Sequence, residues 1–208
     1  MYGYIFKSAL IIFIIINIHH MLICGIDEAG RGPLAGPVVA ASVLMQDYVL
    51  IDNVKDSKKL KEEEREFLFE IIKNNCMQYK IEFVDNKTID EINILNATML
   101  AMEKCLEGMN LINAKIMVDG NYFKLRDNKQ QSLNFETIIG GDDKIFQISA
   151  ASILAKVTRD RIMIQYDKVY PEYNFKKHKG YGTREHIGNI RKYGLCDIHR
   201  KSFCKNFI

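Results

Sequence analysis

The sequence of 208 residues contains no tryptophan and no pair of cysteines at the spacing of a metal site. Its cysteines are odd in number and scattered, which indicates a reduced, cytoplasmic compartment in place of a disulfide framework. These residues are Cys24, Cys76, Cys105, Cys196 and Cys204. After residue 20 the chain also lacks internal repeats, linkers and low-complexity blocks. The length therefore predicts one domain with its own hydrophobic core.

The chain has neither a long apolar run near its start nor a strong excess of one charge. The apolar run at residues 9–16 is too short for a membrane-spanning helix, which needs about 20 residues. Lys7 supplies the basic start of a secretory signal, but no small-x-small cleavage site precedes His19 and His20. The net charge of +3 is compatible with a phosphate-containing partner without requiring one.

Two adjacent acids, Asp27 and Glu28, follow the first of two short apolar segments. These segments, 21–26 and 38–44, are partly β-branched and predict two buried strands. Side chains alternate along a strand, so we expect neighbouring acids to reach one point only where the strand ends. The turn Gly-Arg-Gly-Pro at 30–33 could present an arginine fork to a phosphate. The pattern suggests a metal and a phosphate in one place, although an ordinary hydrophilic turn fits equally well here.

Further strands are predicted at 77–84, 115–119 and 135–139, and helices alternate with them. We expect Ser57 or Asp56 to cap the first helix and Thr88 to open the next. A third helix includes residues 147–160, and the last begins at Gly182 or Thr183. This alternation predicts an α/β fold.

Two more acids follow predicted strands: Asp119 precedes Gly120, and Asp142 follows a Gly-Gly pair. In α/β folds, ligand chemistry occurs at the carboxyl ends of strands. An alternative is that Asp142 or Asp143 caps the next helix. Four carboxylates brought together would repel one another and stay partly protonated without cations, and oxygen ligands suit Mg²⁺ or Mn²⁺.

The segment DEAGRGPLAGPVVAA at residues 27–41 resembles the opening motif of the ribonuclease HII family, the bacterial type 2 ribonucleases H. The resemblance extends from about Met21 to Phe203 and includes the tail at 199–203, which distinguishes it from ribonuclease HIII. It implies a ribonuclease H-like α/β fold at 21–208, with a central mixed five-stranded sheet, flanking helices and a helical C-terminal part.

The resemblance also implies an activity: endonucleolytic hydrolysis of RNA in RNA–DNA hybrids and nicking 5′ to single ribonucleotides in duplex DNA. The products would carry 5′-phosphate and 3′-hydroxyl groups. Two Mg²⁺ or Mn²⁺ ions would straddle the scissile phosphate, one activating water and the other stabilising the leaving oxygen. Their ligands, by the same resemblance, are Asp27, Glu28, Asp119 and Asp142; Asp143 is a poorer match than Asp142.

Substrate contacts are implied for residues in four segments. The family places a Gly-Arg-Gly loop at the ribose 2′-hydroxyl and a tyrosine at the junction between ribonucleotide and deoxyribonucleotide. Serine and lysine side chains lie near the nucleic-acid backbone, although solvated lysines are the commoner case. The corresponding residues here are Gly30, Arg31, Gly32, Ser57, Lys58, Lys156 and Tyr181. His178 and His199 lack the spacing of a zinc site.

Because the resemblance begins at about Met21, we expect Met21 to be the natural start and 1–20 to be an extension outside the family. We expect a cytoplasmic monomer without stable membrane association, and a membrane anchor is the less favoured reading. Two rival functions remain: a non-catalytic protein that binds RNA–DNA hybrids, and a metal nuclease of the same fold that acts on DNA junctions.

Overall fold

A computed structural model describes residues 21–55, 57–125 and 133–207. The extension 1–20 and Asp56 lie outside the described residues, so the expectations about them stay predictions. Within the described ranges, no helix combines the length and the apolar character needed to cross a membrane.

Five strands form one mixed sheet in the spatial order β3-β2-β1-β4-β5. Strand β1 lies at its centre, antiparallel to β2 and parallel to β4. The bounds are β1 Leu22–Ala29, β2 Val38–Gln46, β3 Gln78–Val84, β4 Ala114–Asp119 and β5 Phe135–Ile138. The predicted fold is therefore confirmed.

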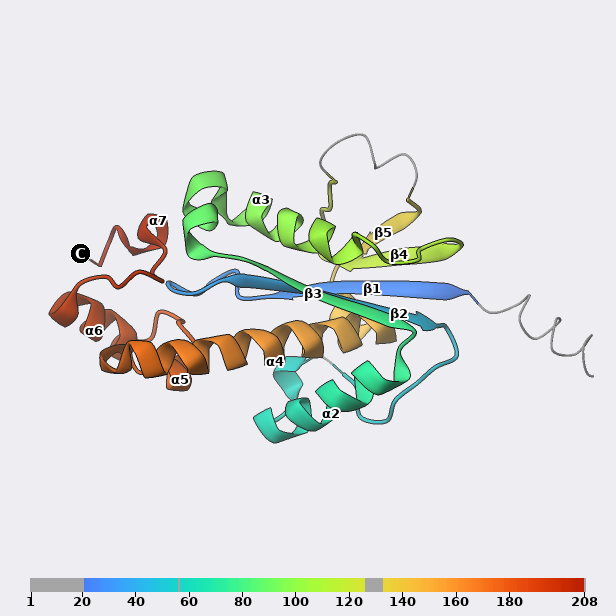
Figure 1. The fold of residues 1–208 in the computed structure, drawn as a ribbon, viewed down its shortest axis with the longest axis horizontal. Coiled ribbons are helices and arrows are strands. Elements are labelled where there is room, and N and C mark those ends of the chain that lie inside the picture. Colours follow the sequence, from blue (N-terminus) through green and yellow to red (C-terminus); the bar gives the residue numbers. More distant parts are fainter. Residues whose placement is uncertain (1–20, 56, 126–132, 208) are drawn as a thin grey trace, which may run out of the picture.

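Helices cover both faces of the sheet (Figure 1). Helix α3, Asn86–Leu106, lies on one face, and α2, Glu62–Asn75, and α4, Phe146–Val169, lie on the other. Helix α4 lies directly on β1, because a Cβ added to Gly25 would come within 2.1 Å of the Gln147 backbone. This close packing places the first turn of α4 against the middle of β1.

The C-terminal part packs against the loop between β1 and β2. It contains α5, Phe175–His178, α6, Arg184–Tyr193, and α7, Lys201–Cys204. Within this part of the structure, Arg200 N donates to Leu34 O at 2.8 Å, and Gly36 N donates to Ile198 O at 2.9 Å. The last segment of the chain thus pairs with the loop that follows the first two acids.

The residues that begin and cap the helices were predicted less well than the presence of the helices themselves. Ser57 does not cap α2: it lies in a separate 3₁₀ turn, and the residue before the helix is Lys61. Neither Asp142 nor Asp143 caps α4, which follows Ile145 without a side-chain cap. Helix α3 starts before Thr88, whose N–H bonds to Asp85 at 2.8 Å.

The last long helix begins as expected. Thr183 precedes α6, and its hydroxyl oxygen accepts a hydrogen bond from His186 N at 3.2 Å. This bond satisfies one of the N–H groups that a helix start leaves without an intrahelical partner.

Candidate active site

Asp27 and Glu28 lie within β1, so the expectation that they follow the end of the strand is wrong. Pairing of β1 with β2 continues through Ala29, whereas pairing with β4 stops at Ile26 and Val118. Asp119 is the last residue of β4 and comes directly after this final pair. The acids meet because a neighbouring strand ends beside them, while β1 itself continues.

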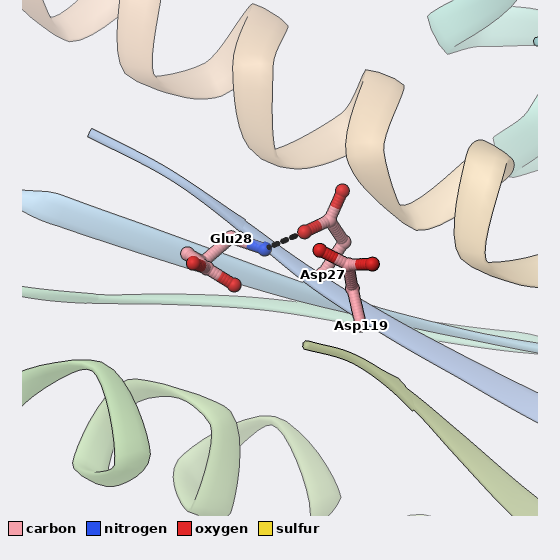
Figure 2. A group of neighbouring side chains, drawn as sticks. All are labelled: Asp27, Glu28 and Asp119. Carbon is pink, nitrogen blue, oxygen red and sulfur yellow. Dashed lines mark hydrogen bonds between the residues drawn. The ribbon is translucent and has the colours of Figure 1, made fainter. Parts of the chain in front are cut away.

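Figure 2 shows the resulting cluster of carboxylates. One oxygen from each of Asp27, Glu28 and Asp119 lies within 4.8 Å of the others. The N–H of Glu28 donates to Asp27 Oδ1 at 2.6 Å, which fixes one carboxylate relative to the next residue. Arg31 Nη1 lies 3.4 Å from Glu28 Oε1 at the edge of the cluster.

Burial and mutual repulsion disfavour the ionised form of these acids. Burial raises the pKa of Asp27 well above 3.8, and the charges of Glu28 and Asp119 add to the effect. Burial also raises the pKa of Glu28, opposed by Arg31, and that of Asp119, opposed by the Gly141 N–H at 2.7 Å. A bound cation would relieve this repulsion, and three carboxylates with only oxygen donors fit a hard divalent ion.

Asp142 lies beside this cluster without belonging to the group of three. It is 6% exposed in a 3₁₀ turn, and its charge contributes to the raised pKa of Asp119. Lys58 Nζ pairs with Asp142 Oδ2 at 3.1 Å. Asp143, by contrast, is exposed and pairs with Lys59. Of the two adjacent acids, Asp142 is the one that faces the site.

A serine that the sequence did not reveal supports the cluster from α4. Ser152 hydrogen bonds to the Asp27 side chain, which partly opposes the rise in its pKa. Ser57 is buried, with its hydroxyl oxygen 2.8 Å from that of Ser152. The Ser57 hydroxyl, which was expected to contact the nucleic-acid backbone, is thus hydrogen bonded to Ser152 behind the acids. Nothing in the spacing of the residues of this helix indicated the bond to Asp27.

The loop after β1 has one tightly packed glycine and one open glycine. Gly30 has φ +96°, and a Cβ on it would lie 2.0 Å from Arg159 Nε. Gly32 is exposed, and a Cβ there would meet no atom within 4 Å. Arg31 between them has an exposed side chain. Gly30 therefore serves the packing of the loop, whereas Gly32 lies on its open side.

Tyr181 and the two lysines occupy different environments. The Tyr181 side chain is 44% exposed, and the Arg159 guanidinium carbon lies 5.7 Å from the centre of its ring. Lys58 lies at the acid cluster, whereas Lys156 is paired with Asp160 at 2.7 Å within α4. The structure therefore brings Lys58 to the acids and places Lys156 in an intrahelical ion pair.

Three histidines near Tyr181 are buried: His178, His186 and His199. Of these, His186 was not identified from the sequence. His199 Nδ1 accepts from Cys196 N at 2.9 Å, so its Nε2–H donates to His186 Nε2 at 3.0 Å. His186 Nδ1–H then donates to Tyr181 O at 3.0 Å. Burial lowers the pKa of both His186 and His199 to about 4. These rings are neutral scaffold groups at neutral pH.

Comparison with known proteins agrees with this geometry. A model of the family described as Ribonuclease HII matches residues 24–206. A protein named Ribonuclease HII from Caldicellulosiruptor saccharolyticus is 52% identical over 189 residues, covering 91% of this chain and 90% of that protein. One from Francisella tularensis subsp. mediasiatica is 50% identical over 183 residues, covering 88% and 95%.

A solved structure is also similar. The crystal structure of the ribonuclease H2 from Pyrococcus horikoshii OT3 matches with a TM-score of 0.72 and 28% sequence identity. The match covers 90% of this chain and 97% of that chain. Sequence and backbone comparisons therefore lead to the same group of proteins.

Proposed function

The chain belongs to the ribonuclease HII family, and we propose that it nicks duplex DNA on the 5′ side of single embedded ribonucleotides. Membership makes it a metal-dependent ribonuclease that hydrolyses RNA in RNA–DNA hybrids. The observation that carries the finer proposal is the position of the acid cluster beside the loop at 30–32. Metal ligands and a reader of the ribose would then lie next to the same phosphate.

Asp27, Glu28 and Asp119 would hold the metal, and Asp142 would complete its surroundings. Two Mg²⁺ or Mn²⁺ ions bound there would supply an activated water and stabilise the charge that develops on the departing 3′ oxygen. The Ser152 hydroxyl and the Gly141 N–H orient Asp27 and Asp119, respectively, for this task. Hydrolysis would leave a 5′-phosphate and a 3′-hydroxyl.

The loop at 30–32 and Tyr181 would recognise the ribonucleotide. The exposed Arg31 and Gly32 lie on the open side of the loop, suited to the ribose 2′-hydroxyl and the adjacent phosphate. The exposed ring of Tyr181 can stack on a sugar or base. Lys58 would contact the phosphate backbone.

Ser57 and Lys156 have weaker support as substrate contacts. The Ser57 hydroxyl is bonded to Ser152, and the Lys156 ammonium group is bonded to Asp160. Each would have to exchange that partner for the nucleic-acid backbone. We further propose that the protein acts as a cytoplasmic monomer.

The test uses a DNA duplex with one ribonucleotide in one strand, incubated with Mg²⁺ or Mn²⁺. The wild-type protein is compared with Asp119→Asn, and a duplex of DNA alone is the control. We expect a nick 5′ to the ribonucleotide that the variant does not make. The product ends distinguish this reaction from alkaline or contaminating cleavage, which leaves a 2′,3′-cyclic phosphate or a 3′-phosphate.

Two results would contradict the proposal. Binding without cleavage by folded protein in both metals would favour the non-catalytic reading. Cleavage of the duplex of DNA alone would favour a DNA nuclease and exclude a reader of the ribose at 30–32.

A further inference from the structure

Two arginine side chains are completely buried behind the loop at 30–37. Arg159 on α4 and Arg200 before α7 are both 0% exposed. Burial lowers the pKa of Arg159 to about 10 and that of Arg200 to about 9, so both are charged at neutral pH. Among the described residues, no carboxylate lies within ion-pair distance of either guanidinium group. Buried charges without ion pairs need another reason to be there.

The carbonyls of the loop are the partners of Arg200. Its Nη2 donates to Gly30 O at 2.6 Å, its Nη1 to Arg31 O at 2.8 Å and its Nε to Gly36 O at 2.9 Å. The planar fork of one guanidinium thus spans the start and the end of the loop. A lysine has one nitrogen in place of this fork and cannot reproduce the three bonds.

These bonds determine which way the loop amides point. Across a trans peptide, the C=O of one residue and the N–H of the next point in opposite directions, and the described residues contain no cis peptide. Drawing the carbonyls of Gly30 and Arg31 inward therefore turns the N–H groups of Arg31 and Gly32 outward. Both residues are exposed, so these donors face the side open to a ligand.

Arg159 joins this loop to the one that carries Tyr181. Its Nε donates to Pro37 O at 3.0 Å, its Nη2 to Ala35 O at 3.1 Å and its Nη1 to Lys179 O at 2.9 Å. A backbone bond from Leu34 N to Gly180 O at 2.8 Å ties the same two loops. The guanidinium also lies 5.7 Å from the Tyr181 ring centre.

We propose that Arg159 and Arg200 are positioning residues for substrate discrimination, holding the 30–32 amides and Tyr181 in one fixed arrangement that selects a ribonucleotide over a deoxyribonucleotide. This inference rests on the proposed function, since it assigns the source of selectivity at that site. Neither arginine touches the substrate. Their effect passes through six backbone carbonyls.

The experiment measures discrimination by binding, separately from turnover. Asp119→Asn protein serves as the background, so that duplexes stay intact in the presence of Mg²⁺. Dissociation constants are measured by fluorescence anisotropy for a duplex with one ribonucleotide and for the same duplex with a deoxyribonucleotide there. The ratio of the two constants is compared among the background, Arg200→Lys, Arg159→Lys and Ile72→Ala.

Ile72→Ala is the matched control, because it removes a fully buried side chain of α2 in a core cluster separate from the one that includes the loop residues Leu34 and Ala35. Lysine keeps the positive charge, so the two arginine variants test geometry. We expect each lysine variant to reduce the preference for the ribonucleotide about tenfold, as the loss of one to two hydrogen bonds would. The control should melt at a lower temperature and keep its preference.

The outcomes separate the two proposals. Unchanged preference in both folded lysine variants, or an equal loss in Ile72→Ala, would overturn the positioning role. Absence of any preference in the background protein would overturn it too. Turnover is measured separately in the proteins that carry Asp119. If these proteins do not cleave the duplex, the proposed function is contradicted, whereas the positioning role is judged by the binding ratios. As a further readout, amide hydrogen exchange at Leu34 and Gly36, whose N–H groups bond to Gly180 O and Ile198 O, should become faster in Arg200→Lys.

Discussion

Two groups of ionisable side chains lie at the same end of the sheet, and their surroundings differ in opposite ways. The acids of β1 and β4 stand close to one another, with pKa values raised by burial. Behind the loop, the buried arginines and histidines bond to backbone groups or to each other. Among the described residues, no buried side-chain nitrogen or oxygen lacks a hydrogen-bond partner.

The difference shows which region is prepared for a ligand. Like charges held together in a buried place are unfavourable until a cation arrives, so the acid cluster retains unused binding energy. A guanidinium bonded to three carbonyls has no such surplus, because each of its three nitrogens already has a carbonyl partner. The acids are thus the group that a cation would stabilise, and the arginines and histidines support the loop beside them.

The largest effect should come from neutralising the acid cluster. Asp27→Asn should reduce cleavage of an RNA–DNA hybrid by about 10²- to 10³-fold, because a proposed metal ligand is lost. The same variant should stabilise the metal-free protein at pH 7.5, where the ionised form of Asp27 is unfavourable. The pKa of Asp27 is raised on folding, so its ionised form opposes folding and stability falls as pH rises through that pKa. Initial rates and urea unfolding in EDTA measure the two effects.

Asp143→Asn is the matched control for this prediction, since Asp143 is an exposed acid next to Asp142. It should change neither rate nor stability appreciably. Addition of Mn²⁺ should raise the melting temperature of the wild-type protein and of Asp143→Asn more than that of Asp27→Asn. Destabilisation of the metal-free protein by Asp27→Asn would show that the cluster is not under electrostatic stress.

The two glycines of the loop provide the next comparison. Gly30→Ala should destabilise the protein by about 2 kcal/mol or more, because φ is +96° and the new Cβ would overlap Arg159. Gly32→Ala should change the free energy of unfolding by less than about 0.5 kcal/mol, since its Cβ meets open space. Thermal melting measures both.

Gly32→Ala, the variant expected to keep its stability, should nevertheless bind the substrate less well. Folded Gly32→Ala should have a raised KM for the ribonucleotide-containing duplex, because the added methyl group projects where the substrate is proposed to lie. An unchanged KM in Gly32→Ala would exclude the open side of this loop from the binding surface.

The histidines should make stability depend on pH in the opposite sense to the acids. The pKa values of His186 and His199 are about 4 in the folded protein against 6.5 ordinarily. Below pH 6.5 the unfolded chain takes up protons that the folded protein does not. Stability should therefore fall as pH decreases from 6.5 toward 4, by up to about 1.4 kcal/mol per pH unit for each histidine.

Urea unfolding between pH 7.5 and 5 tests this slope. His199→Gln should be less stable at pH 7.5 but should lose less with each unit of acidification, because one buried imidazole is gone. A slope as steep as that of the wild-type protein would mean that this histidine pair is not the source of the acid sensitivity.

The smallest effect should come from Lys58, whose side chain is 77% exposed although it pairs with Asp142. Lys58→Ala should change the free energy of unfolding by less than about 1 kcal/mol, as is usual for exposed ion pairs. The KM for an RNA–DNA hybrid should rise severalfold and show a weaker dependence on salt. Lys59→Ala is the control, because Lys59 pairs with the exposed Asp143.

Adjacent residues and short periodic patterns were sufficient for much of the site. Apolar, β-branched runs predicted all five strands, with bounds that shifted by at most a few residues. Asp27, Glu28 and Asp119 were expected to meet because each follows a predicted strand, and the structure brings them together although β1 continues to Ala29. These features depend on neighbours in the chain, which the sequence displays directly.

Helix caps were predicted less well, because several side chains near a helix start can serve equally. Ser57 bonds to Ser152, 95 residues away, where a cap was expected. Asp90 lies near the start of α3, yet its carboxylate accepts from the distant N–H groups of Lys201 and Ser202 at 2.8 and 3.0 Å. Competition between local and distant partners is settled only when the chain is folded.

By itself, the sequence determined the order of strands and helices, the identity of the acids and the position of the loop beside them. The tertiary structure alone decided what holds that loop. Arg200 reaches Gly30 across 170 residues and bonds to a backbone carbonyl, a group that every residue carries. Such a contact leaves no pattern in side-chain chemistry, because its acceptor is the same for any amino acid. It exists only because the packed C-terminal segment pairs with the loop after β1.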